Sequence, residues 1–258
     1  MTDGGMREQT IWRPGRPVPL AAIVGTLRRG AGDPTFRYDR GSVWRAMRTP
    51  LGPATAHLVS DAAAGEVHCV AWGPGRQWVL DRLPQLLGDA DVTADDFTRA
   101  YSHRHPFVVH ALRRHPHYRV QRTGLVFEAL LAAVLEQKVT GQEAFAGWRR
   151  LVRRFGDPAP GAGAQLGLRV VPPSETVLRI PSWEWLRLPV DPARSRAAVT
   201  AARARVRSPS RSSVDCTRDE PRATATAPAD RKGPMSSIPT PPVGTNATWS
   251  SGPRRAFR

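Results

Sequence analysis

The clearest periodicity of the chain lies in its middle. Phe127, Leu130, Leu131, Val134 and Leu135 recur at i, i+3, i+4, i+7 and i+8. This spacing places them on one broad face of a helix, because an α-helix turns every 3.6 residues. The pattern predicts an amphipathic helix from about residue 127.

Two further helices are predicted from their start signals. Thr140 and Glu143 have the spacing of a capping box, and the helix that they open runs to Phe155, with Gly156 as its stop. Asp191 followed by Pro192 is typical of an N-cap and a first helical position, which predicts a helix over residues 193–206.

The first hundred residues have the pattern of short strands instead. Residues 43–48, 54–59 and 67–72 alternate or cluster apolar side chains between turns rich in glycine and proline. Short strands joined by tight turns favour an antiparallel sheet. Residues 78–87 follow as a predicted helix. The chain therefore predicts an α+β fold with strands first and helices second.

The last part of the chain shows neither period. Residues 207–258 hold eight prolines and eight serines, but only six residues of the Val, Ile, Leu, Met, Phe or Trp type. Such a segment buries too little apolar surface to offset its ordering entropy, so the composition predicts disorder. Two origins fit it: a genuine flexible basic tail, or the product of a frameshift in a GC-rich gene.

Charge adds a candidate partner. The net charge is +16, and residues 1–206 keep +11 after the tail's 9 basic and 4 acidic residues are removed. A basic excess of this size indicates a polyanionic partner, although only two of the basic residues are lysine, so codon bias towards arginine is an alternative explanation. The sequence predicts no membrane span, no signal peptide, no disulfide and a cytoplasmic location.

Several motifs occur together in a fixed order. They are GAGDPTFRYD at residues 30–39, FEALLAAVLEQKVTGQEAF at 127–145, PSETVLRIPSWEW at 173–185, and Arg194 and Arg196 entering a helix. Together they resemble the actinobacterial branch of the 3-methyladenine DNA glycosylase II family, within the helix-hairpin-helix superfamily. The similarity covers roughly residues 12–206.

The resemblance implies an organisation and a function. Residues 1–105 would form a small antiparallel α+β domain, 106–206 the first part of an all-helical glycosylase domain, and 207–258 a disordered tail. The protein would act as a monomer without a cofactor, associated with the nucleoid. It would bind duplex DNA containing alkylated purines, flip the damaged base out of the stack and hydrolyse its N-glycosidic bond in base excision repair.

The resemblance ends before the expected catalytic residue. The family's hairpin, of the form Leu-Pro-Gly-Ile-Gly-x-Trp-Thr-Ala, and the aspartate beyond it have no counterpart, since Asp215, Asp219 and Asp230 lie in the predicted tail. Three hypotheses follow: a glycosylase that is inactive or impaired, a non-catalytic DNA-binding protein, or an enzyme that uses another carboxylate, such as Glu136 or Glu184.

The resemblance also nominates DNA-contacting residues. Gln137 and Lys138 match the turn that enters DNA at the lesion, although a lysine there favours a phosphate contact over an apolar wedge. The other candidates for DNA contact are Thr140, Arg149, Arg150 and Arg153, with Arg113, Arg114 and Arg154 as further phosphate candidates; for each arginine a solvated helix face is the alternative.

Two tryptophans and a group of histidines complete the candidates. Trp183 and Trp185 are candidates to line a base pocket, with core packing as the alternative. His103, His105, His110, His115 and His117 do not have zinc-ligand spacing, so no metal site is predicted.

A final expectation concerns the core. Without the hairpin and the helices after it, the apolar stripes of the helical half would lie open, leaving Phe127, Leu131, Val134, Phe145 and Trp148 in an exposed patch. The sequence therefore predicts a partly molten helical half and a shallow open groove in place of a catalytic pocket.

Overall fold

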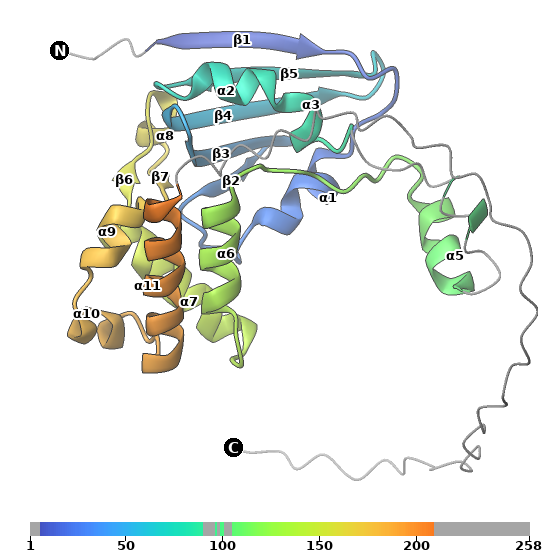
Figure 1. Ribbon diagram of the computed structural model, residues 1–258. Coiled ribbons are helices and arrows are strands. Elements are labelled where there is room, and N and C mark those ends of the chain that lie inside the picture. The colour runs from blue at the N-terminus through green and yellow to red at the C-terminus, as the bar shows by residue number, and fades with distance from the viewer. Residues whose placement is uncertain (1–5, 90–95, 97–98, 101–104, 209–258) are drawn as a thin grey trace, which may run out of the picture. The chain divides into compact units, whose positions relative to one another are not determined.

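The computed structural model describes residues 6–89, 96, 99–100 and 105–208, all within one compact unit that spans residues 1–215. A five-stranded antiparallel sheet occupies its first part, and helices make up most of the rest (Figure 1). This mixed α+β architecture confirms the predicted fold class. The predicted tail at 207–258 lies outside the described residues from 209 on, together with Asp215, Asp219 and Asp230.

The sheet contains the three predicted strands and two more. Its spatial order is β1 (Arg7–Trp12), β5 (Glu66–Trp72), β4 (Gly52–Asp61), β3 (Ser42–Thr49) and β2 (Phe36–Asp39). The sequence prediction missed β1 and β2, which are the two edge strands. Edge strands bury less of their surface than central ones, so their apolar alternation is weak, as in the largely polar β1.

One face of the sheet packs on short helices. These are α1 (Leu20–Val24), the 3₁₀ turn η1 (Gly25–Leu27), α2 (Arg76–Asp81) and α3 (Leu83–Leu86), and they enclose a core with Val43, Leu58 and Val67. The helix predicted over residues 78–87 is thus two helices. Pro84 explains the break, because proline lacks the amide hydrogen and clashes with the preceding turn.

The other face of the sheet is partly covered by a later hairpin. Strands β6 (Asp157–Pro158) and β7 (Arg169–Val170) flank helix α8 (Ala162–Gln165), and Ala159, Leu168 and Val170 pack against Ala46 of β3. Thr55 donates its hydroxyl hydrogen to the carbonyl of Pro160 at 2.8 Å. The second half of the chain therefore returns to the sheet.

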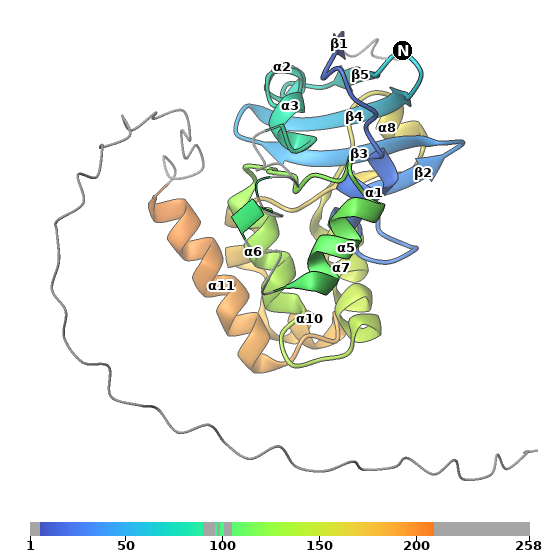
Figure 2. The same cartoon turned by 90° about the vertical axis from the view of Figure 1, so that its right-hand side faces the viewer.

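The helical half lies beside the sheet. It comprises α5 (Pro106–Arg114), α6 (Val126–Leu135), α7 (Gly141–Phe155), α9 (Ser174–Arg179), α10 (Ser182–Arg187) and α11 (Pro192–Arg207). Helices α6, α7 and α11 extend between the sheet and the far end of the helical half, where the turn between α6 and α7 lies (Figures 1 and 2). The predicted capping box of Thr140 and Glu143 and the Asp191 cap are both present.

The prediction of an exposed apolar patch on the helical half is wrong. Leu131, Val134 and Trp148 are buried, and Phe127 and Phe145 are half-buried. The reason is that α11 packs across α6 and α9 and supplies Ala198 and Ala202 to the same core. Small residues let α11 approach closely, so the helices that the chain already contains cover most of the stripe. Val126 and Leu130 remain exposed on α6.

Candidate nucleic-acid interface

The turn between α6 and α7 presents two of the predicted DNA-contacting side chains. Gln137 and Lys138 are exposed there. Lys138 adopts a φ of 54°, the left-handed region that residues other than glycine adopt at a cost of about 1 kcal/mol or more. Lys138 makes no hydrogen bond or ion pair with any described residue. The turn therefore holds a strained, unpaired cation at the end of the helical half.

The capping box fixes the exit from this turn. The Thr140 hydroxyl oxygen accepts from the Glu143 amide at 3.4 Å, and the Thr140 amide donates to Glu143 Oε2 at 3.0 Å. The Thr140 amide and the Thr140 hydroxyl, which donates to the same Oε2 at 2.9 Å, lower the pKa of the Glu143 carboxyl. Because its hydroxyl is already hydrogen-bonded to Glu143, Thr140 acts as the N-cap of α7.

The entrance to the turn is held by α11. Arg194 is buried and donates from Nη1 to the carbonyl of Leu135, the last residue of α6, at 2.8 Å. The same guanidinium pairs with Asp191, and the Arg194 side chain and backbone, with the Ala193 amide, lower the pKa of the Asp191 carboxyl to about 2. A second tie runs from Arg29 to Glu136 at 2.9 Å. The entrance to the turn is thus anchored to two separate parts of the fold.

The four arginines of α7 separate into two pairs. Arg154 pairs with Glu184 of α10 at 2.6 Å, and Arg150 donates to the Arg187 carbonyl at 3.3 Å. Arg149 and Arg153 make no hydrogen bond or ion pair within the described part of the chain, although the Arg149 stem lies against Gly32. Arg149 and Arg153 are therefore the α7 cations that remain available to a phosphate.

The two tryptophans of α10 differ in how far they are buried. Trp185 is buried in the helical core, whereas Trp183 is 61% exposed and the nearby Leu186 is 64% exposed. Neither tryptophan lines the cavity described below. The base-pocket role of this pair stays a prediction. Trp185 itself packs in the helical core.

The carboxylates proposed as alternative catalysts are both engaged. Glu136 pairs with Arg29, and Glu184 is buried between Arg154 and Arg187. The structure adds Glu128, which pairs with the buried Arg45 of β3 and whose carboxyl pKa burial raises. Sequence reasoning missed Glu128, although its spacing to Leu131 and Leu135 places it on the buried face of α6.

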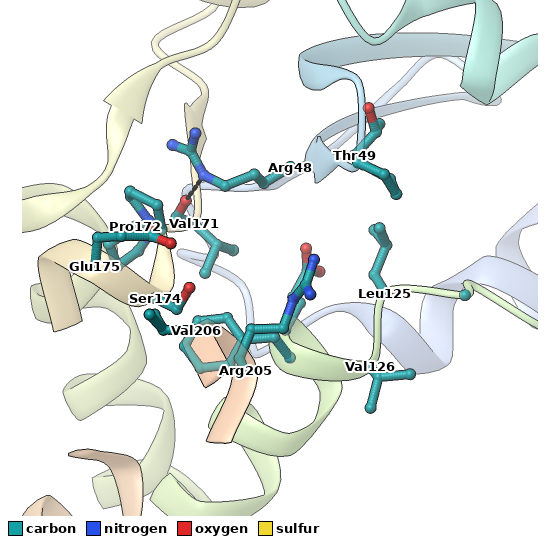
Figure 3. Close-up of a pocket in the computed structure, with 15 residues that line it drawn as sticks. Arg48, Thr49, Leu125, Val126, Val171, Pro172, Ser174, Glu175, Arg205 and Val206 are labelled. Atoms are coloured by element: carbon teal, nitrogen blue, oxygen red, sulfur yellow. Dashed lines mark hydrogen bonds between the residues drawn. The ribbon is translucent and has the colours of Figure 1, made fainter. Parts of the chain in front are cut away.

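A cavity of about 210 Å³ opens where the sheet meets the helices (Figure 3). Arg48 and Thr49 come from the end of β3, Glu128 from α6, Glu175 from α9, and Arg205 from α11, whose side chain reaches into the space. Arg48 is fixed there, because Nε donates to the Val171 carbonyl at 2.8 Å. The cavity holds both carboxylates and arginines and does not include the α6–α7 turn.

The described residues contain neither a metal-site cluster nor a membrane-spanning helix. Among the side chains that the structure describes, no three of His, Cys, Asp and Glu come together as a metal site. His103 lies outside the described residues. Within residues 6–89, 96, 99–100 and 105–208, no helix combines the length and apolarity needed to cross a bilayer.

Comparison with known proteins gives matches in structure alone. No protein-family model and no curated protein sequence matches the chain. The 3-methyladenine DNA glycosylase from Archaeoglobus fulgidus superposes with a TM-score of 0.60 at 15% identity, over 75% of this chain and 66% of that one. The 8-oxoguanine glycosylase/lyase of Clostridium acetobutylicum, in complex with double-stranded DNA, gives 0.55 at 9% identity, over 81% and 67%.

A third structure agrees with these two. MBOgg1, in complex with a low-affinity DNA ligand, superposes with a TM-score of 0.54 at 13% identity, over 80% of this chain and 66% of that one. The chain spans about two thirds of the length of the structures that it matches. At identities this low the comparison concerns architecture, and it shows that this chain has the fold of the DNA glycosylases.

Proposed function

We propose that this chain is a base-excision DNA glycosylase-like protein that binds duplex DNA through its α6–α7 turn. The observation that carries the proposal is the turn itself: Lys138 is strained and unpaired, the entrance of the turn is anchored by Arg194, and its exit is closed by the Thr140–Glu143 capping box. Strain that surrounding structure maintains is typical of functional sites. Arg149 and Arg153 would add phosphate contacts, and Gln137 would lie against the opened base pair.

We further propose that the ancestral substrate is an alkylated purine and that excision is lost or severely impaired. The support is the resemblance over residues 12–206 and the lack of a counterpart to the hairpin and its aspartate. The protein would act as a monomer on the chromosome in the cytoplasm. The second candidate, a non-catalytic DNA-binding protein, is favoured by the net charge of +16 and differs in having no ancestral lesion site.

The test combines binding with excision on the full chain. We expect duplex affinity to fall steeply as salt rises, because phosphate contacts release counterions. Intact duplex and duplex carrying an alkylated purine should bind about equally, and base release should match a control without protein. Turnover clearly above that control would refute the loss of activity, and an affinity that does not respond to salt would refute the phosphate contacts.

Replacing Lys138 separates the stability of the turn from its function. Lys138→Gly should raise the free energy of unfolding by up to about 1 kcal/mol, since glycine adopts positive φ without strain. The same change should weaken DNA binding and reduce the salt slope by about 0.9, the contribution of one phosphate. Lys138→Arg is the matched control, because it keeps both the charge and the strain. Equal DNA binding by the glycine variant and the wild type would contradict a contact by Lys138.

A further inference from the structure

Helix α11 has an outward ridge of arginines. Arg196, Arg203 and Arg207 are exposed, whereas Ala198 and Ala202 are buried on the opposite side. At 100° per residue the three arginines fall within about 40° of arc, directed away from the core. We call Arg196, Arg203 and Arg207 the α11 ridge.

The ridge has no internal charge compensation. None of its three side chains makes a hydrogen bond or ion pair with a described residue, and α11 itself contains no acidic residue. Arg203 and Arg207, four apart on the helix, repel each other, because like charges at this spacing face one another. The helix dipole favours Arg207 in the last turn, but it gives no such support to Arg196 near the other end. Folding therefore does not explain the ridge.

The spacing of the ridge suits a nucleic-acid backbone. With a rise of 1.5 Å per residue, Arg196 lies about 10 Å from Arg203 along the axis, and Arg203 about 6 Å from Arg207. The ridge thus spans about 16 Å, over which one strand of a duplex presents about five phosphates. Guanidinium groups bind phosphate oxygens in pairs of hydrogen bonds, which favours arginine for this contact.

The ridge starts beside the α6–α7 turn. Arg194 joins the first turn of α11 to the Leu135 carbonyl at the end of α6. In both views α11 then runs from that end towards the sheet (Figures 1 and 2). A backbone that contacts Lys138 can therefore continue along the ridge, whereas Arg150 and Arg154 of α7 are held by α10.

We propose that the α11 ridge is a phosphate-binding surface that follows one strand of duplex DNA away from the α6–α7 turn. This rests on the proposed function, because it takes duplex DNA as the partner. It adds a contact surface on α11 to the α7 arginines that the family resemblance nominates. An acidic protein surface is the competing partner, and the salt response to DNA distinguishes the two.

The test is a triple substitution in the full chain, R196Q/R203Q/R207Q. Each lost phosphate contact lowers the slope of log affinity against log salt by about 0.9, so the slope should fall by roughly 2 to 3. The matched control is R37Q/R40Q/R122Q, which removes the same charge from exposed arginines near the sheet that have no described side-chain partner. The control should change the slope by less than about 0.5.

A lysine triple, R196K/R203K/R207K, guards against a folding effect. It keeps the charge, so most of the wild-type slope should return. The proposal is overturned if the glutamine triple keeps the wild-type slope, or if the control triple lowers it equally, since net charge alone would then explain binding. Failure of the wild-type protein to bind duplex DNA at all would refute the proposed function itself. The wild-type measurement alone distinguishes that result from a failure of the ridge proposal.

Discussion

Replacing Glu128 with leucine is expected to lower the free energy of unfolding by about 3–5 kcal/mol, the cost of leaving a buried charge without its partner. The Arg45 side chain is 3% exposed and Glu128 11%. Arg45 Nη2 donates to Glu128, while Nε and Nη1 are buried without a partner among the described residues. Removing the carboxylate therefore strands the whole guanidinium group inside the protein.

Two further variants isolate the charge. R45M/E128L removes both partners and should recover most of the loss, because an apolar pair of similar volume avoids the desolvation cost. Glu128→Gln should cost much less than Glu128→Leu, since the amide oxygen still accepts from Arg45. Urea denaturation followed by circular dichroism measures all three. A double variant as unstable as Glu128→Leu would show that lost packing, not the stranded charge, sets the cost.

The Glu128→Gln comparison also has a defined pH dependence. Burial raises the pKa of the Glu128 carboxyl above its unfolded value, so folding favours the neutral form more than the unfolded chain does. The stability that this group contributes is present below the unfolded pKa and is lost as the pH rises through the folded pKa. The glutamine variant lacks this loss, so its stability relative to the wild type should improve as the pH rises over that window.

The second large effect is expected at Trp148. Its indole is 3% exposed within the helical core, and Nε1 donates to Asp33 Oδ1 at 3.0 Å. Trp148→Ala should cost about 3–5 kcal/mol through the cavity that it leaves. That is a large share of a typical stability of about 5–15 kcal/mol, so the variant should unfold at a much lower urea concentration.

Two substitutions control this result. Trp148→Phe keeps most of the packing and should cost about 1–3 kcal/mol, because Asp33 retains its bonds from Thr35 and the Arg29 amide. Trp183→Ala makes the same chemical change at an exposed position and should stay within about 0.5 kcal/mol. Similar losses for Trp148→Ala and Trp183→Ala would mean that the helical half lacks the packed core described above.

Much of the local structure was determined by the sequence itself. The Thr140–Glu143 box, the Asp191–Pro192 start of α11 and the central strands β3, β4 and β5 follow from nearest-neighbour hydrogen bonding and apolar periodicity. The edge strands β1 and β2 were not predicted, because they bury one side less completely and their apolar alternation is therefore weak. The predicted helix over residues 78–87 is interrupted before Pro84, because proline cannot continue the preceding helical turn.

The remaining features depend on residues far apart in the chain, so only the tertiary structure decided them. Glu128 meets Arg45 across 83 positions, Trp148 meets Asp33 across 115, and Arg194 reaches Leu135 across 59. The alanines of α11, a face with little apparent hydrophobicity, complete the helical core because small side chains allow close approach. Pairing of this kind is set by three-dimensional packing, on which the periodicity of a single segment carries no information.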